Sequence, residues 1–202
     1  MDEDKKEEQK EESGIYILLD TSVLFAYVHE KDAHHLSVES ALGAIKPYKP
    51  RICIPSVVLL ETMGKLIREG KKSVAQAKKI LEDKLKEFDT RFEHRSINHK
   101  IILDRYKGYS KSDVSKLKAI DFYIVVEAIS ISACLLTCDK EMYEKTKSKH
   151  KKIFYLGDNT KTQLPKLIKE VEKEFHGIKK PSIIKKSENE KINQPPISQP
   201  AQ

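Results

Sequence analysis

Five short apolar runs alternate with helical patterns along the middle of the chain. Runs of this kind, bounded by polar residues, predict β-strands. They cover Ile15–Leu19, Arg51–Ile54, Arg91–Ile97, Ala133–Thr137 and Lys152–Leu156. Strands that alternate with helices are typical of βαβ units. The pattern therefore predicts an α/β fold with three layers, α/β/α, in which helices flank a central, mostly parallel sheet.

Two of the intervening helices carry clear signals at their ends or along one face. Ser73 and Gln76 have the spacing of a capping box, in which each side chain bonds the backbone N–H of the other residue. The apolar residues that follow recur at helical spacing and predict an amphipathic helix. A second set of apolar residues at this spacing predicts a helix near the C-terminus, and its members are Leu164, Leu167, Ile168, Val171 and Phe175.

The ends of the chain differ in composition from its middle. Residues 1–14 are almost entirely charged or polar, and residues 177–202 are rich in Lys, Pro and polar residues. Segments of this composition bury too little apolar surface to fold, so we expect two disordered tails. The expected organisation is one domain over residues 15–157, followed by an amphipathic helix over residues 158–176 that packs on it.

Charge and cysteine content narrow the classes of function. The net charge is +7, and residues 1–14 alone carry −4, which leaves about +11 for the rest of the chain. A surface this basic favours a polyanionic partner, nucleic acid before membrane. The three cysteines have neither the even number of a disulfide scaffold nor the spacing of a zinc site. No apolar run approaches the length of a membrane span, so we expect a cytoplasmic protein.

Two carboxylates directly follow predicted strands. Asp20 comes after the run "IYILL" and Asp139 after "ACLLTC", and each precedes a helical stretch. In an open α/β sheet, ligands bind beyond the carboxyl ends of the strands, so both side chains are candidates for a binding site. Asp is also a preferred helix N-cap, so each one taken alone is explained equally well as a cap.

Two further carboxylates fall within apolar helix stripes. Glu61 lies inside the predicted inward stripe Val57, Leu60, Gly64 and Ile67. Asp121 lies in the same way among Leu117, Ile124, Ala128 and Ile131. An ionised carboxylate in such a place is costly unless a cation compensates it. A slightly rotated helix that places Glu61 at a solvent-exposed rim is the alternative. Glu127, outside the second stripe, is predicted at a rim.

Considered together, the four carboxylates predict a metal site. If the two strand ends and the two helix faces converge at one edge of the sheet, the negative charge opposes folding unless a divalent cation lies among them. A ligand set of oxygen atoms without His or Cys suits Mg²⁺ or Mn²⁺.

These motifs resemble the PIN-domain nucleases, which include the toxin ribonucleases of the VapC type. The matching motifs are "LLDTSVL", "IPSVVLLETMGKL", "LKAIDFYIVVEA" and "LLTCDKEM", in this order. The resemblance implies that Asp20, Glu61, Asp121 and Asp139 are both the catalytic and the metal-binding residues, with one or two Mg²⁺ or Mn²⁺ ions. It implies cleavage of RNA, and it leaves open a homodimer and an antitoxin protein as partners.

The resemblance also assigns secondary roles. Ser22 and Thr137 match hydroxyl positions that support the acids. Asp113 and Asp104 are alternatives for the third acid, although Asp113 fits a helix cap and Asp104 precedes the buried helix. Basic residues near the second motif are candidates for binding the RNA backbone without sequence preference. They are Lys65, Arg68, Lys71 and Lys72, together with the segment 145–152.

Two other functions compete with a ribonuclease. A strand that ends in Asp also opens the haloacid-dehalogenase-like phosphatases, but those use a second Asp two positions later, where this chain has Ser22. A catalytically silent PIN-like module that binds RNA or supports assembly is the third possibility. The presence of all four acids favours an active enzyme.

Overall fold

The computed structural model describes residues 15–87, 92–95, 117–158 and 160–175 of the protein. Its core is a five-stranded parallel sheet with the strand order β3-β2-β1-β4-β5. The strands are β1 (Tyr16–Leu19), β2 (Arg51–Pro55), β3 (Phe92–Arg95), β4 (Cys134–Thr137) and β5 (Ile153–Tyr155). Four strands lie within predicted runs, and β2 extends one residue beyond its run, so the predicted strands and the parallel sheet are confirmed.

The central strands are buried on both faces, as their uninterrupted apolar sequences require. Ile17, Leu18 and Leu19 of β1 have no exposed surface, and neither do Cys134, Leu135 and Leu136 of β4. A parallel sheet covered by helices on both sides needs such runs rather than alternating polar residues. The three cysteines are all buried and free.

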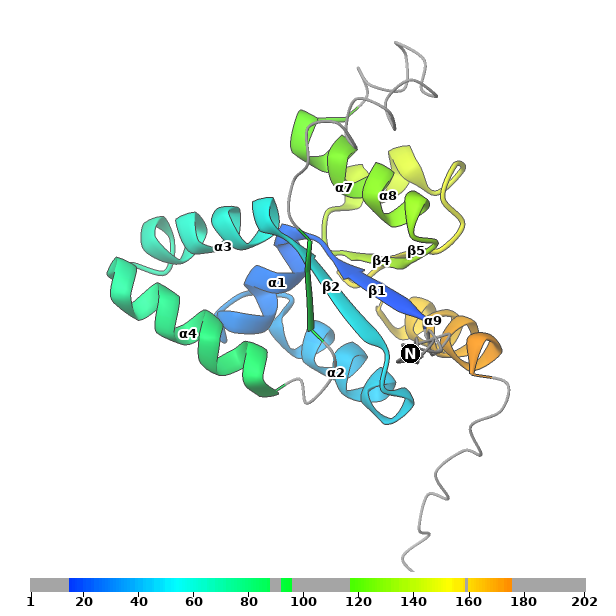
Figure 1. Ribbon diagram of the computed structural model, residues 1–202, viewed down its shortest axis with the longest axis horizontal. Coiled ribbons are helices and arrows are strands. Elements are labelled where there is room, and N and C mark those ends of the chain that lie inside the picture. Colours follow the sequence, from blue (N-terminus) through cyan, green and yellow to red (C-terminus); the bar gives the residue numbers. More distant parts are fainter. Residues whose placement is uncertain (1–14, 88–91, 96–116, 159, 176–202) are drawn as a thin grey trace, which may run out of the picture.

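Four helices follow β1 and β2 and cover one face of the sheet (Figure 1). They are α1 (Thr21–Val28), α2 (His35–Ile45), α3 (Ser56–Arg68) and α4 (Val74–Glu87), and a short 3₁₀ helix (Lys46–Tyr48) ends α2. The capping box in front of α4 is present. The Ser73 backbone N–H donates to Gln76 Oε1 at 2.9 Å, and the Gln76 N–H donates to Ser73 Oγ at 3.2 Å.

The opposite face carries α7 (Ala119–Ser130) and α8 (Lys140–Thr146) (Figure 1). Helix α9 (Thr160–Glu174) follows β5 and packs against β5 and α2, where Leu167 and Val171 are fully buried. Helices on both faces of one parallel sheet make the three-layer α/β/α arrangement that the sequence predicts. The predicted tails, residues 1–14 and 177–202, lie outside the described residues.

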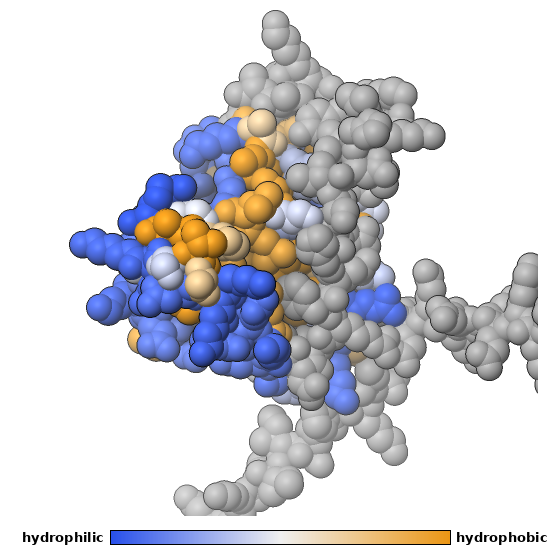
Figure 2. All heavy atoms as spheres, turned by 60° about the vertical axis from the view of Figure 1, so that its left-hand side comes forward, coloured by the Kyte–Doolittle hydropathy of each residue, from blue (hydrophilic) through white to orange (hydrophobic). Residues whose placement is uncertain are grey.

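The predicted inward stripe of α3 is wrong by about one residue. Val58, Thr62 and Leu66 are the buried residues of this helix, whereas Leu60 is 69% exposed. Figure 2 shows apolar surface among hydrophilic side chains on the side of α3 and α4. Because α3 carries apolar residues on two adjoining faces, periodicity alone did not distinguish the face that packs on the core.

The prediction for Glu127 is also wrong. Its side chain is only 3% exposed, so it does not lie at a rim. Every residue from Ile124 to Ala128 is buried in α7. A helix buried over consecutive residues has no solvent-facing side at that level, so a position outside the apolar stripe is enclosed as well.

Candidate functional site

The candidate site lies where the strand order reverses direction, between β1 and β4. The two strands pair in parallel, with Leu19 beside Leu136, so that Asp20 follows β1 at the level of Thr137. The Asp20 backbone N–H donates to Leu136 O at 3.2 Å, which extends the pairing to this residue. A crevice at such a switch point, beyond the carboxyl ends of the strands, is the usual ligand site of an open α/β sheet.

Asp20 is a buried carboxylate held by three donors. It is 4% exposed, and its Oδ1 accepts a hydrogen bond from the Ser22 backbone N–H, as expected for the N-cap of α1. Its Oδ2 accepts from the hydroxyls of Ser22, at 3.0 Å, and Thr137. Burial raises the pKa of Asp20 to about 6, against the lowering effect of these bonds, and the charge of Asp121 adds to the rise. Asp20 is therefore both the N-cap of α1 and a residue of the candidate site, so the two interpretations of this residue do not exclude each other.

Thr137 connects Asp20 to Asp139. Its hydroxyl donates to Asp20 Oδ2 and accepts from the Asp139 backbone N–H at 2.9 Å. Asp139 is the N-cap of α8 and accepts from the Met142 N–H at 2.9 Å through Oδ1. Ser22 makes a second connection, because its Oγ accepts from the Cys138 N–H at 2.7 Å. The ends of β1 and β4 are thus joined through two hydroxyls.

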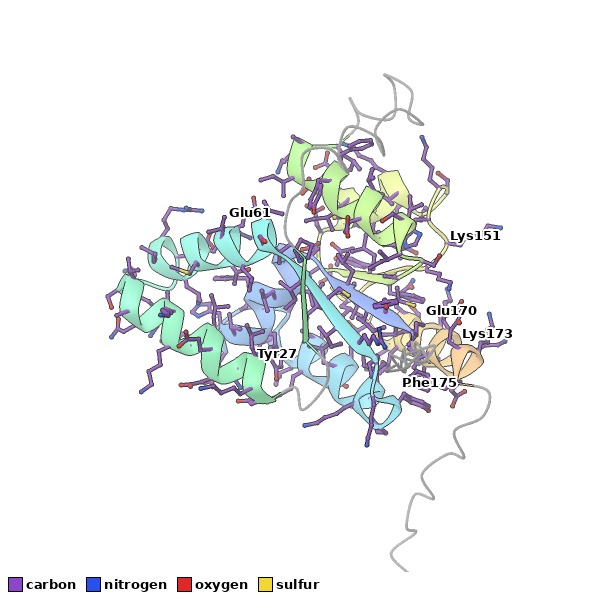
Figure 3. The ribbon with its side chains drawn as sticks, in the orientation of Figure 1. Tyr27, Glu61, Lys151, Glu170, Lys173 and Phe175 are labelled. Atoms are coloured by element: carbon purple, nitrogen blue, oxygen red, sulfur yellow. The ribbon has the colours of Figure 1, made fainter. Side chains whose placement is uncertain are left out.

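Glu61 reaches the site from α3. It lies on the part of α3 nearest the central strands (Figure 3), and its Oε2 accepts a 2.5 Å hydrogen bond from the hydroxyl of Thr21. Thr21 is buried and follows Asp20 directly, so this bond fixes Glu61 beside the end of β1. Although the predicted stripe of α3 is wrong, Glu61 is half-buried and directed toward α1 rather than free at a rim.

Asp121 is the fourth carboxylate, in the first turn of α7. Its pKa is raised, first by burial and then by the negative charges of Asp139, Glu61 and Glu141, while Lys118 opposes the rise. Asp121 in turn raises the pKa of Asp20. Asp121 lines the same hollow as Asp139, which Thr137 links to Asp20, so Asp121 lies at the same edge of the sheet.

The four carboxylates share this edge without forming a ready-made ligand cage. Among the described residues, no three His, Cys, Asp or Glu side chains make a group that could hold one ion. Asp121 and Asp139 line a hollow of about 230 Å³ between α7 and α8, and Asp20 and Glu61 are not among its lining residues. The alternatives for the third acid, Asp104 and Asp113, lie outside the described residues.

The predicted substrate-binding residues Lys65 and Arg68 lie farther along α3. The Lys65 ammonium lies 5.3 Å from the centre of the Phe25 ring, on α1. Arg68 is exposed and folds back over Gly64, where its Nη1 lies 3.0 Å from the place that a Cβ would occupy. In segment 145–152, Lys145 pairs with Glu141 and Lys147 pairs with Glu144.

Sequence reasoning missed two residues of this site. Thr21 is one of them, although a hydroxyl directly after a candidate acid, at the start of a helix, is a recognisable signal. Lys118 lies one turn before Asp121 and shares the hollow with it. Its spacing from Asp121, three residues along one helix, is visible in the sequence.

Comparison with known proteins identifies the fold. No curated protein matches the chain. Among solved structures, the crystal structure of PAE2754 from Pyrobaculum aerophilum is similar, with a TM-score of 0.42 and 20% sequence identity over 80% of this chain and 96% of that chain. The PIN domain family profile matches residues 17–148, which include all four carboxylates. The chain therefore belongs to the PIN domain family.

Proposed function

We propose that the protein is a metal-dependent endoribonuclease that hydrolyses RNA phosphodiester bonds. PIN domains have a nuclease-type fold and typically bind divalent metal. One observation carries the proposal, which is the position of Asp20. A carboxylate only 4% exposed, with its pKa raised to about 6, lies at the switch point of the sheet and is coupled to a second acid. An ionised group in this place favours a bound cation.

The donor set fits Mg²⁺ or Mn²⁺. Asp20, Glu61, Asp121 and Asp139 offer only oxygen ligands, which hard divalent cations prefer. The raised pKa values of Asp20 and Asp121 reflect burial and mutual repulsion, and both effects are relieved by a positive ion. When bound, such an ion lowers the pKa of a coordinated water and stabilises the negative charge that develops on the phosphodiester.

The chain's own residues orient these ligands. Thr21 holds one oxygen of Glu61, and Thr137 and Ser22 hold Oδ2 of Asp20. The N–H of Met142 holds one oxygen of Asp139. Hydrogen bonds to ligating carboxylates fix their rotamers and raise metal affinity, commonly by tenfold or more. Asp121 lies in the first turn of α7, so the start of this helix sets its position.

RNA is the proposed substrate because the chain outside residues 1–14 carries about +11 charges. Lys65 and Arg68, on the same helix as Glu61, are proposed to contact phosphates and to add affinity without sequence choice. The proposal includes both an RNA-processing enzyme and a toxin-type enzyme with an antitoxin partner. It also includes a homodimer. The positions of the cuts in total RNA and a sizing measurement separate these cases.

The test is cleavage of total RNA by the full chain with Mg²⁺ or Mn²⁺, with EDTA, and by Asp20→Asn. We expect cleavage only with metal, and a loss of at least a hundredfold in Asp20→Asn with an unchanged circular dichroism spectrum. Asp83→Asn, an exposed acid on α4, is the matched control and should cleave as the wild type does. Cleavage by Asp20→Asn at the wild-type rate with saturating metal would overturn the assignment.

One observation favours a second candidate, a catalytically silent RNA-binding module. The described residues contain no group of three or more His, Cys, Asp or Glu side chains that could hold an ion. A silent module predicts that RNA is retained in a gel-shift assay equally with metal and with EDTA, and that no product forms under either condition. An active nuclease predicts metal-dependent product with free 3′ ends that can be mapped.

A further inference from the structure

The hollow beside Asp121 and Asp139 contains two lysines as well as acids. Its volume is about 230 Å³, and it is lined by Leu117, Lys118, Asp121, Asp139, Glu141, Met142 and Lys145. Pockets that enclose whole small molecules usually measure roughly 300–1,000 Å³. The hollow is therefore smaller than the pockets that enclose whole small molecules, and it lies directly beside two of the four proposed metal ligands.

The two lysines differ in how their charge is used. The Lys145 ammonium lies 2.5 Å from Glu141 Oε1, four residues earlier on α8, so its charge is compensated within the helix. Lys118 is exposed and belongs to none of the ion pairs among the described residues. It acts on Asp121 and Glu141 only through space. Its charge opposes the rise that burial causes in the pKa of Asp121, and it adds to the lowering that Lys145 causes in the pKa of Glu141.

Within the part of the chain that the structure describes, the Lys118 side chain has no structural role that explains its place. It is the N-cap of α7, but its side chain makes no capping hydrogen bond, and the cap is supplied by its backbone oxygen, which accepts from the Phe122 N–H at 2.9 Å. Any residue can provide that backbone oxygen. The ammonium group is therefore available to a ligand in the hollow, and its removal leaves the start of α7 intact.

We propose that Lys118 binds a phosphate of the RNA strand that adjoins the bond to be cleaved, and that the hollow between α7 and α8 is the subsite for this nucleotide. The inference deepens the proposed function and depends on it for the identity of the substrate. A phosphodiester that approaches four carboxylates is repelled outside the immediate reach of a metal ion. A lysine that is not in contact with an acid provides a compact, strongly hydrated positive charge at this edge.

The geometry also gives Lys118 a different role from Lys65 and Arg68. Those residues lie on α3, on the far side of the sheet from α7, and follow Glu61 by one and two turns. Lys118 precedes Asp121 by one turn on α7. Contacts from both helices would hold the strand on the two sides of the switch point, with the acids between them. Phosphate contacts of this kind set position and carry no sequence preference.

Two measurements test the proposal, and the matched control is Lys169→Ala, an exposed lysine on α9 that lines no described hollow. In cleavage assays with Mn²⁺, we expect Lys118→Ala to lower kcat/KM by about ten- to a hundredfold, mainly through KM, because a charged hydrogen bond is lost. Lys118→Arg should restore most of the loss. Lys118→Glu should lower kcat/KM further, whereas Lys169→Ala should change it by less than twofold.

The second measurement needs no catalysis. In the Asp20→Asn background with EDTA, we measure the affinity for a single-stranded RNA oligonucleotide across salt concentrations. Lys118→Ala should reduce the slope of log affinity against log salt by about 0.7, the value for one lost contact with single-stranded phosphate. An unchanged slope together with an unchanged KM would overturn the role of Lys118.

The two assays separate the failure of this inference from the failure of the proposed function. If wild type cleaves RNA and Lys118→Ala matches it in both assays, the nuclease stands and the subsite is wrong. If wild type fails to cleave while the salt slope still falls in Lys118→Ala, the subsite binds RNA in a silent module. If wild type neither cleaves nor binds RNA, both proposals are wrong.

Discussion

The hydroxyl of Thr21 donates a hydrogen bond of 2.5 Å to Glu61 Oε2 and thereby ties the first turn of α1 to α3. Thr21 is 8% exposed, so the bond is sheltered from water and is stronger than a surface contact. The bond holds the Glu61 carboxylate against α1, and the N-cap of this helix is Asp20, a second carboxylate of the candidate site. Thr21 and Ser22, which are adjacent in the first turn of α1, therefore position Glu61 and Asp20 respectively.

Thr21→Val removes this hydroxyl and keeps the volume of the side chain. We expect Mn²⁺ affinity and kcat to fall about tenfold, because Glu61 loses the contact that fixes its rotamer. Thr21→Ser restores the hydroxyl and should recover most of both. Isothermal titration with Mn²⁺ measures the affinity without RNA. Equal Mn²⁺ affinity in Thr21→Val and wild type would show that the bond has no influence on the metal site.

Thr62 offers the contrasting case on the same helix. It is fully buried, and its hydroxyl has no hydrogen-bond partner among the described residues. A buried unpaired hydroxyl costs free energy that an apolar group of the same shape avoids. We expect Thr62→Val to raise the free energy of unfolding by about 1 kcal/mol and to leave Mn²⁺ affinity unchanged. Urea denaturation checks the first outcome, and a loss of stability would contradict it.

The stability of the metal-free protein should depend on pH through Asp20. Its pKa is raised from 3.8 to about 6 in the folded state, so between about pH 4 and 6 the folded state binds more protons than the unfolded state. The free energy of unfolding therefore falls as pH rises through this interval, by at most about 3 kcal/mol from this group. Urea denaturation at pH 4.5 and 7.5 measures the fall.

The control for this measurement is Asp20→Asn, which cannot ionise. Between pH 4.5 and 7.5, the free energy of unfolding should fall less in this variant than in wild type, because the contribution of Asp20 is absent. At limiting Mn²⁺, cleavage should rise with pH as Asp20 ionises, because a proton on Asp20 competes with the metal, and saturating Mn²⁺ should move this rise to lower pH. A wild-type stability difference equal to that of Asp20→Asn would mean that Asp20 ionises normally in the folded protein.

Metal should stabilise the folded chain. A ligand at a hundred times its dissociation constant adds about 2.7 kcal/mol to the free energy of unfolding. We expect Mn²⁺ to raise the Tm of wild type at pH 7.5 and EDTA to reverse the rise. Asp121→Asn and Glu61→Gln should reduce the rise, and Glu39→Gln, an exposed acid on α2, should not. A full rise in Asp121→Asn would place the bound ion elsewhere.

The parts of this protein that sequence predicts well are those in which one physical requirement dominates. The central strands β1 and β4 are almost entirely apolar because helices cover both faces of the sheet there. The capping box at Ser73 is equally local, since both of its hydrogen bonds join residues three apart. Signals of this kind do not depend on how distant segments pack.

The errors concern which face of a helix is covered, and this depends on neighbours that are distant in sequence. Helix α3 has apolar residues around more than half its circumference, so Leu60 and Val58 are equally good core candidates until α1 and α4 are placed. The apolar pattern of α7 indicates a buried helix, but whether the helix is enclosed at the level of Glu127 depends on the elements packed around it. Lys118 is a candidate binding residue only because it lines the hollow that α8 helps to form, and the sequence alone does not predict that hollow.

The strand order has a consequence for when the protein acquires its chemistry. Asp20 directly follows the first strand of the sheet, but its hydrogen-bond partner Thr137 belongs to the fourth strand in the sequence, and the two strands are adjacent. During synthesis, Asp20 therefore leaves the ribosome long before β4, the strand that carries its partner Thr137. The carboxylates of the candidate site therefore cannot come together until β4 has been synthesised and has docked beside β1.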